Sequence, residues 1–174
     1  MDTAGKLKAA IRDVPDFPKP GIIFKDITPI LGDPALFRLA VDALAAPYAG
    51  KGIRKVAAID ARGFIFGAGV AARLGAGLVP VRKKGKLPYR TIEQACTLEY
   101  GEAVLAVHVD AFQKGEPVLL IDDLLATGGT AAAAARLVER AGGKIVDVAF
   151  LIELTFLNGR AKLAGYPVST VIQF

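Results

Sequence analysis

The chain has 174 residues, of which 53% are hydrophobic and 22% are charged, a composition typical of one globular domain and not of a disordered chain. No apolar stretch approaches the roughly 18 residues that a membrane span needs, no secretory signal is expected, and the single cysteine excludes an intrachain disulfide, so we expect a cytoplasmic protein. The net charge of +5 favours anionic ligands, and we expect a small polyanion and no nucleic acid, because no aromatic residues interleave the basic cluster at 82–86.

The first quarter of the chain predicts two helices joined by an irregular arm. Residues 5–12 are expected to form a short helix, whereas PDFPKPGIIF at 15–24 contains too much proline for regular structure. Asp33 and Pro34 provide an N-cap and a first-turn proline for the second helix. The apolar face of this helix repeats at helical spacing through Leu36, Phe37, Ala40, Val41 and Leu44.

Strands and helices then alternate, which predicts an α/β fold with a mainly parallel sheet and helices on both faces. The expected strands are 55–60, 78–82, 118–122, 146–154 and 168–172, and the expected helices are 67–74 and 130–140. Ligands of such sheets bind beyond the carboxyl ends of the strands. Because Asp60, Arg82 and Asp122 fall at these ends, we expect them to converge.

Residues 83–102 carry charge, proline and glycine and show no helical period, so we expect a long loop. A small hairpin between 98–100 and 104–107 could form in it. Loops of this length in compact domains often act as lids over a site.

The most informative segment is VLLIDDLLATGGT at 118–130. It predicts a buried strand, two carboxylates and then a small-residue loop that leads into a helix. Such a loop can fold its backbone N–H groups around an anion, assisted by the helix N-terminus. Asp122 and Asp123 beside it could accept hydrogen bonds from sugar hydroxyls or help to hold a divalent metal, so a phosphorylated sugar is the expected ligand.

Several other classes of site are disfavoured. No Walker A pattern occurs, and GAGVAA at 67–72 begins too far beyond the expected strand end at Asp60 for a dinucleotide turn. One cysteine and one histidine, Cys96 and His108, make a zinc site or a Cys-His nucleophile implausible. The sole serine, Ser169, has no nucleophile-elbow motif around it.

Six segments occur in the order seen in one family, the type I phosphoribosyltransferases, and most resemble its adenine branch. They are PDFPKPGIIFKDI, DARGFIFG, RKKGKLP, LEYG, DDLLATGGT and LIELTFLNGR. The resemblance implies the type I phosphoribosyltransferase fold over one domain, 1–174, with a mainly parallel twisted sheet flanked by helices. It also implies an N-terminal arm or hood at 1–32 and a flexible lid loop and hairpin at 83–107.

The resemblance further implies a purine salvage reaction. Adenine and 5-phosphoribosyl 1-pyrophosphate would give AMP and pyrophosphate, with Mg²⁺ as cofactor. The magnesium would be held by pyrophosphate, ribose hydroxyls and water near the two acids, without direct protein ligands. Members of the family are usually homodimers, and neither nucleic acid nor a membrane is an expected partner.

The roles of individual residues follow from the same resemblance. Asp122 and Asp123 would orient the ribose, and Glu99 would be the acid–base group at the purine ring, next to Tyr100 in a segment that closes over the site. The 5′-phosphate would be bound by Ala126, Thr127, Gly128, Gly129 and Thr130. The pyrophosphate would be bound by Arg62, Arg82, Lys83 and Lys86. Adenine would be met by backbone groups of Ile23 and Lys25 and by the ring of Phe24; many family members have arginine where this chain has Lys25.

Two alternatives remain open on the sequence. The same fold could use another purine base, such as hypoxanthine or guanine. A non-catalytic regulator could instead retain the phosphoribosyl site and bind nucleic acid, although the presence of both acids and of Glu99 with Tyr100 argues against this.

Overall fold

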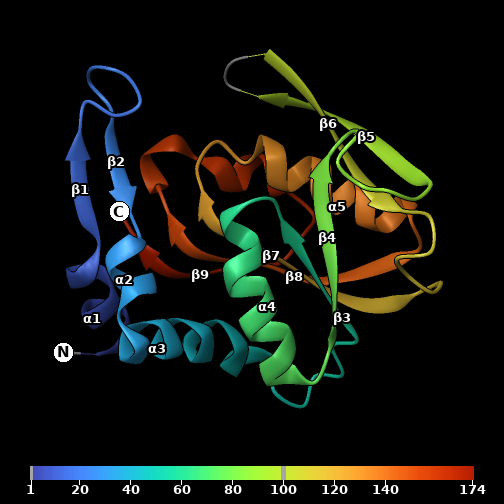
Figure 1. Ribbon diagram of the computed structural model, residues 1–174, viewed down its shortest axis with the longest axis horizontal. Coiled ribbons are helices and arrows are strands. Elements are labelled where there is room, and N and C mark those ends of the chain that lie inside the picture. The colour runs from blue at the N-terminus through green and yellow to red at the C-terminus, as the bar shows by residue number, and fades with distance from the viewer. Residues whose placement is uncertain (1, 99–100) are drawn as a thin grey trace.

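A computed structural model shows one seven-stranded sheet with helices packed on both faces, and a separate two-stranded hairpin formed by the N-terminal arm (Figure 1). The structure describes residues 2–98 and 101–174. The strands of the large sheet lie in the order β5-β6-β4-β3-β7-β8-β9. They span Lys55–Ile59 (β3), Gly77–Lys83 (β4), Thr91–Leu98 (β5), Gly101–His108 (β6), Glu116–Leu125 (β7), Gly143–Glu153 (β8) and Val168–Gln173 (β9).

The sheet is mixed but mainly parallel. The five strands from β4 to β9 in the sheet order pair in parallel, whereas β6 pairs antiparallel with β4, and β5 pairs antiparallel with β6. The two antiparallel strands extend the sheet at one edge and rise above the carboxyl ends of the parallel strands (Figure 1). The predicted α/β class and parallel sheet are therefore confirmed.

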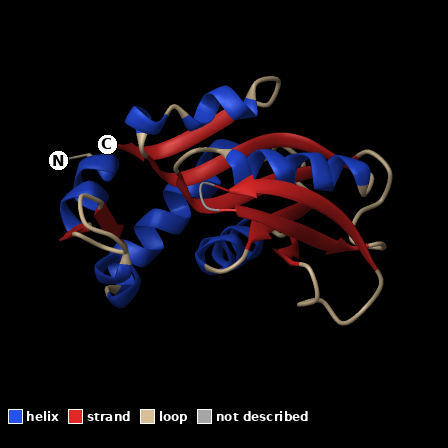
Figure 2. Cartoon of the chain, turned by 90° about the horizontal axis from the view of Figure 1, so that it is seen from above, coloured by secondary structure: helices blue, strands red, loops and turns tan. Residues whose placement is uncertain are grey.

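Helices cover the two faces of the sheet unequally (Figure 2). One face packs against α3 (Pro34–Ala45) and α4 (Arg62–Leu74), and the other packs against α5 (Gly129–Arg140). Alternate residues of β7 point to opposite faces, as strand geometry requires: Leu119 joins the core under α3 and α4, and Leu120 the core under α5. The remaining helical elements are α1 (Thr3–Ala10), α2 (Thr28–Gly32), η1 (Ala46–Tyr48), η2 (Thr155–Leu157) and η3 (Gly159–Leu163). No helix in the described part of the chain is both long and apolar enough to cross a membrane.

The helices begin and pack as their residues dictate. Asp33 caps α3, because its carboxylate accepts hydrogen bonds from the backbone N–H groups of Ala35 and Leu36 at 2.8 and 2.9 Å. A Cβ added to Gly67 of α4 would lie 2.4 Å from the Cβ of Ala58 on β3, so glycine permits this close contact. The run of alanines at 131–135 likewise brings α5 close to the sheet.

The N-terminal arm is more regular than its prolines indicate. Strands β1 (Arg12–Pro15) and β2 (Ile23–Asp26) form an antiparallel hairpin, so the expected irregular segment at 15–24 is confirmed for 16–22 and is wrong at its two ends. Pro18 and Pro20 lie in the connection between the strands, where they interrupt no ladder. Proline therefore marks the turn of this hairpin and not the absence of strands.

The expectation of a loop over 83–102 is also wrong in its second half. Strands β5 and β6 form a long antiparallel hairpin in register from Thr91 opposite His108 onward, and only the segment 84–90 between β4 and β5 is irregular. Buried Cys96 and partly buried Ile92 pack against the α5-side core, while charged Glu93 points away from it. The period-two pattern is weak in the sequence, because polar Gln94 stands between Ile92 and Cys96 on the same side of the strand.

Two element bounds near the expected site differ from the prediction. Helix α4 begins at Arg62 and not at Gly67, so the DARGF segment is mostly helical. Strand β7 continues through both acids to Leu125, because its pairing with β8 persists to Leu125 opposite Glu153. Both acids therefore lie in the part of β7 that pairs with β8 and no longer with β3.

Candidate functional site

The centre of the site is the place where the chain reverses its direction across the sheet. Strand β3 leads through α4 to β4 on one side, and its other neighbour, β7, leads through α5 to β8 on the opposite side. The pairing of β3 with β7 ends at Ala58 opposite Ile121, and beyond this point β7 pairs with β8 alone. Such a switch point opens a crevice at the carboxyl ends of the strands, where open α/β sheets bind ligands.

A small hollow lies between the end of β7 and the start of α5. The segment 126–130, named here the phosphate loop, forms most of a hollow of about 100 Å³ whose wall also includes Asp122. Gly128 is the N-cap of α5 and has a φ of +80°, a left-handed conformation that favours glycine. The first N–H groups of a helix have no partner within the helix, so this loop presents donors and the positive end of the α5 dipole to an anion.

The two acids occupy different environments. Asp123 is 6% exposed, and its backbone N–H donates to Oδ1 of Asp122 at 2.8 Å. Burial, and then the adjacent charge of Asp123, raise the pKa of the Asp122 carboxyl well above its usual value. Gly63 at the start of α4 makes this burial possible, because a Cβ there would lie 2.9 Å from Oδ1 of Asp122.

Arg62 connects the acids to the N-terminal hairpin. Its Nε donates to Oδ2 of Asp123 at 2.5 Å, and its guanidinium lies 5.6 Å from the centre of the Phe24 ring. Burial alone would lower the pKa of Arg62, but the hydrogen bond and charge of Asp123, with the charge of Asp122, produce a net rise. The structure therefore brings Arg62, Phe24 and both acids together, as the sequence prediction requires.

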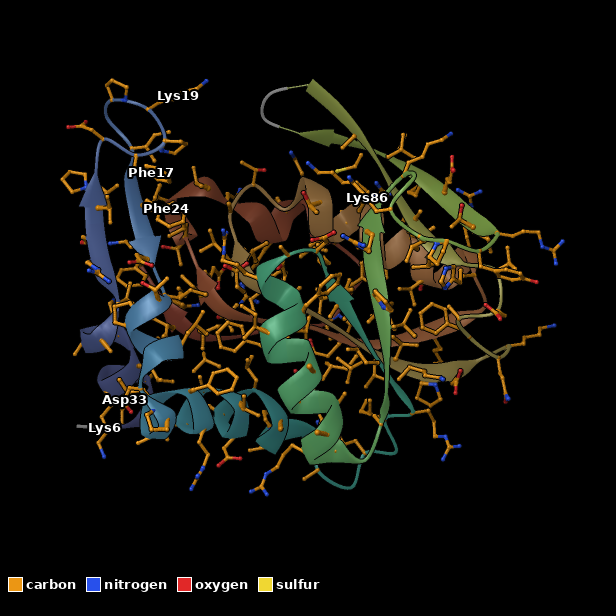
Figure 3. The ribbon with its side chains drawn as sticks, in the orientation of Figure 1. Lys6, Phe17, Lys19, Phe24, Asp33 and Lys86 are labelled. Atoms are coloured by element: carbon orange, nitrogen blue, oxygen red, sulfur yellow. The ribbon has the colours of Figure 1, made fainter. Side chains whose placement is uncertain are left out.

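A second cationic group lies at the end of β4. Arg82 donates through Nε to Oδ2 of Asp60 at 2.8 Å and through Nη1 to the carbonyl oxygen of Lys86 at 3.1 Å. Asp60 and Arg82 contact each other, and α4, which begins two residues after Asp60, lies against Asp122 at Gly63, so the three predicted residues lie around the same end of the sheet. Lys86 is exposed above β4 on the side of the sheet where Phe24 also lies (Figure 3), and Lys83 is exposed too.

The hairpin β1–β2 presents one aromatic face to the site. Phe24 packs edge-to-face against Phe17, with ring centres 5.2 Å apart, and Figure 3 shows both near the top of the hairpin. Lys25 points the other way: its Nζ contacts Oδ1 of Asp13 at 2.7 Å and lies 4.1 Å from the centre of the Phe174 ring. Its side chain is thus committed elsewhere, which leaves its backbone groups and those of exposed Ile23 for a ligand.

Two of the predicted residues, Glu99 and Tyr100, lie outside the described residues. The strands on either side of them belong to the β5–β6 hairpin, which rises on the same side of the sheet as the β1–β2 hairpin (Figure 1). The C-terminal part of β5 lies close to the phosphate loop, because Sγ of Cys96 lies 4.0 Å from Oγ1 of Thr130. The two hairpins therefore flank the crevice that contains the acids.

Sequence reasoning missed the residues that support the site from behind. Gly63 fits against Asp122, and Gly159 fits against the phosphate loop. Buried Glu153 at the end of β8 holds Arg160 through two hydrogen bonds of 2.7 and 2.9 Å. The segment LIELTFLNGR was identified only by its family resemblance. Its Asn-Gly pair, which is typical of a tight turn, was the local signal for this support.

Comparison with known proteins agrees with this geometry. The family described as the phosphoribosyl transferase domain matches residues 34–168. An adenine phosphoribosyltransferase of Acidothermus cellulolyticus is 56% identical over 170 residues, covering 97% of this chain and 96% of the relative. The crystal structure of adenine phosphoribosyltransferase from Rhodothermus marinus is 57% identical with a TM-score of 0.93, over 99% of this chain and 98% of that one.

A more distant relative was solved with ligands. The adenine phosphoribosyltransferase of Saccharomyces cerevisiae, in complex with adenine and an imino-altritol bisphosphate, is 39% identical with a TM-score of 0.92. The match covers 97% of this chain and 98% of the yeast chain. The chain belongs to the phosphoribosyl transferase domain family, and within it to the adenine phosphoribosyltransferases.

Proposed function

We propose that this protein transfers the phosphoribosyl group of 5-phosphoribosyl 1-pyrophosphate to adenine, which gives AMP and pyrophosphate in purine salvage. The observation that carries the proposal is the hollow of the phosphate loop, which opens directly beside Asp122 at the switch point of the sheet. The relatives at 56 and 57% identity have the same activity in their names.

The 5′-phosphate end of the substrate is assigned to the phosphate loop. Backbone N–H groups from Ala126 to Thr130, with the hydroxyls of Thr127 and Thr130, would surround the phosphate oxygens. The α5 dipole adds a favourable field at the same point. Binding the phosphate here sets the ribose over Asp122 and Asp123.

The acids would then orient the ribose hydroxyls and favour positive charge on the sugar. Departure of pyrophosphate leaves an oxocarbenium-like ribose, as in other glycosyl transfers. Asp122, whose pKa is raised, and Asp123, which is paired with Arg62, would face the ribose hydroxyls from adjacent positions.

The leaving pyrophosphate is assigned to the cations around the end of β4. These cations come from three neighbouring places, namely the start of α4 (Arg62), the end of β4 (Arg82 and Lys83) and the β4–β5 connection (Lys86). Positive charge aimed at a leaving group lowers the barrier, because negative charge grows there in the transition state. Arg62 and Arg82 are paired with Asp123 and Asp60, which orients their guanidinium groups.

Magnesium fits this site as a cofactor bound mainly through the substrate. Carboxylate oxygens are the donors that Mg²⁺ prefers, but here Oδ2 of Asp123 already accepts from Arg62 and Oδ1 of Asp122 from a backbone N–H. Pyrophosphate, ribose hydroxyls and water would therefore supply its ligands near these acids. When bound, the ion neutralises charge on the pyrophosphate.

Adenine is assigned to the space between the two hairpins. Phe24 would stack on the purine ring, and backbone groups of Ile23 and Lys25 would meet its polar edge. Glu99 would act on the purine proton and Tyr100 would close over the site, as the family resemblance implies. The arm at 1–32 would act as a hood, and the segment 83–107 as a lid that keeps water from the reacting carbon.

We further propose that the protein works as a cytoplasmic homodimer without nucleic acid or membrane partners. Incubation with labelled adenine, 5-phosphoribosyl 1-pyrophosphate and Mg²⁺ tests the activity, and AMP is the expected product. Parallel assays with hypoxanthine and guanine test the choice of base. Turnover of those bases but not of adenine would contradict the assignment, and so would selective RNA binding without any turnover.

A further inference from the structure

A turn near the C-terminus packs directly behind the phosphate loop. Asn158 links η2 to η3, of which Gly159 is the first residue, and Asn158 has a left-handed φ of +50°. The contact between this turn and the loop is made by backbone atoms on both sides. A Cβ on Gly128 would lie 2.2 Å from the carbonyl oxygen of Gly159, and a Cβ on Gly159 would lie 2.3 Å from that of Ala126.

Because of this contact, the turn at 158–160 and the phosphate loop can hardly move closer to each other. Two main chains that touch without side chains between them have no rotamer that can absorb a displacement. If the turn at 158–160 moves toward the loop, the carbonyl group of Ala126 and the Cα of Gly128 must move too. The N–H groups that face the hollow belong to the same peptide planes and their neighbours, so their directions change with it.

Arg160 fixes the turn to the end of the sheet. Its Nε and Nη2 donate to the two carboxylate oxygens of Glu153 at 2.7 and 2.9 Å, and its Nη1 donates to the carbonyl oxygen of Val168 at 2.9 Å. Glu153 is 4% exposed and also accepts from Thr170 and Gln173, both at 3.0 Å. The hydrogen bonds from Arg160 hold the pKa of Glu153 below its usual value.

Glu153 is also connected to the phosphate loop, through the pairing of β8 with β7. Glu153 pairs in register with Leu125, the last residue of β7 before the phosphate loop, and the N–H of Leu154 donates to the carbonyl oxygen of Leu125 at 2.9 Å. The loop is therefore held from β7 and β8 on one side and from the turn at 158–160 on the other. Arg160 links these two supports, because it follows Gly159 in the turn and donates to Glu153 at the end of β8.

We propose that Arg160 is a positioning residue for the reaction: through Glu153 and Gly159 it sets the direction of the phosphate-loop N–H groups without touching substrate. This rests on the proposed function, in which the loop binds the 5′-phosphate. It predicts an effect specific to the phosphorylated sugar. Lysine cannot replace the paired hydrogen bonds of the guanidinium group, although it keeps the charge.

The test is calorimetric binding of ribose 5-phosphate and of AMP to Arg160→Lys and to Gly159→Ala. We expect ribose 5-phosphate affinity to fall by about tenfold to a hundredfold in each, as a displacement near 1 Å would cause. In steady state the KM for 5-phosphoribosyl 1-pyrophosphate should rise while the KM for adenine stays unchanged. A residue needed only for folding would lower the active fraction and the melting temperature without separating the two KM values.

Two variants serve as matched controls. Arg73→Lys removes a guanidinium on α4 that pairs with Asp42 on α3 at 2.9 Å, away from the loop. Gly32→Ala adds a Cβ that meets nothing within 4 Å. Both should bind ribose 5-phosphate as the wild type does. If Arg160→Lys and Gly159→Ala also bind it as the wild type does, the positioning role is wrong. If the wild type does not bind it, the proposed function fails as well.

Discussion

Asp122 and Asp123 are adjacent in the chain but differ in what surrounds each carboxyl. Asp122 is packed against the glycine at the start of α4 and has a raised pKa, whereas Asp123 faces the guanidinium of Arg62. Like charges on neighbouring carboxyls are unfavourable, which adds to the effect of burial on the pKa of Asp122, while Asp123 pairs with Arg62. The two positions therefore respond differently to the same substitution.

Asp122→Asn should change how stability depends on pH. A carboxyl whose pKa is raised by folding binds its proton more tightly in the folded state, so wild-type stability falls as pH rises above 3.8 toward the folded pKa. Asparagine has no proton to lose, and its Oδ1 can still accept the N–H of Asp123. Urea unfolding from pH 4 to pH 8 should show the variant gaining on the wild type by up to roughly 1.4 kcal/mol per pH unit. A difference that is constant over this range would contradict the raised pKa.

Asp123→Asn should instead damage catalysis. It removes the anion that orients Arg62 and that would favour the cationic ribose, and we expect kcat to fall by about a hundredfold or more, as for other charge-stabilising groups. Steady-state assays check this, with Asp42→Asn as the control, because Asp42 pairs with Arg73 on the outer surface. Equal kcat values for Asp123→Asn and the control would remove Asp123 from the reaction.

At the scale of elements, the site combines a rigid part with an appended part. The run from β7 through the phosphate loop to α5 lies in the middle of the sheet between two cores, and its position follows from strand pairing. The β1–β2 hairpin belongs to its own two-stranded sheet and meets the rigid part at the site through Phe24 and Arg62. The rigid part is assigned to the sugar phosphate and the appended part to the base.

This division predicts that Phe24→Ala acts mainly on adenine. Stacking of a base on an aromatic ring contributes about 1–3 kcal/mol by alanine substitution, so the KM for adenine should rise by about tenfold or more. The KM for 5-phosphoribosyl 1-pyrophosphate should change much less, because the phosphate loop makes no use of this ring and Arg62, which lies against it, keeps its hydrogen bond to Asp123. Phe156→Ala removes a phenylalanine that is 73% exposed and is the control. An unchanged adenine KM in Phe24→Ala would place the base elsewhere.

The sequence predicted the rigid part well for physical reasons. The apolar residues at 118–121 favour a strand, the glycines at 128–129 favour a turn, and the alanines at 131–135 favour a helix. These three local preferences agree with the structure over 118–140. The appended parts were less predictable, because prolines at 15–20 concealed β1 and β2, and polar Gln94 between Ile92 and Cys96 broke the apolar repeat of β5. The strands exist there because partners from the same hairpin pair with them, which local pattern does not reveal.

The site shows the same limit. The expectation that Asp60, Arg82 and Asp122 converge followed from one rule about strand ends. The direction of the Lys25 side chain follows from no such rule, since it depends on Asp13 and the distant Phe174. Nor does the support of the phosphate loop by Gly159, a contact between segments about thirty residues apart whose only local sign is a glycine.

At the scale of the whole molecule, the fold brings together segments from the full length of the chain. The N-terminal hairpin, the turn before α4, the β4–β5 connection and the phosphate loop all lie on the side of the sheet where the parallel strands end (Figure 1). A sheet with both faces covered leaves this end as the place where backbone N–H groups and charged side chains can meet a ligand. The mechanism assigned here depends on that arrangement and not on any one motif.

The proposed homodimer belongs to this scale. Ile65 on α4 and Leu78 on β4 are 38% and 42% exposed, which is consistent with apolar surface available for association. Sedimentation equilibrium should give a mass of about 36 kDa, twice the 18.2 kDa of the chain. A mass equal to that of one chain at micromolar concentration would contradict the proposed assembly and leave the assignment of the site intact.

The most direct test of the account is a crystal structure of the protein with AMP. The account predicts the phosphate of AMP in the hollow at 126–130, within hydrogen-bond distance of backbone N–H groups there, with the ribose over Asp122 and Asp123. A structure in which the nucleotide binds at another place, and this loop contacts no phosphate, would contradict it.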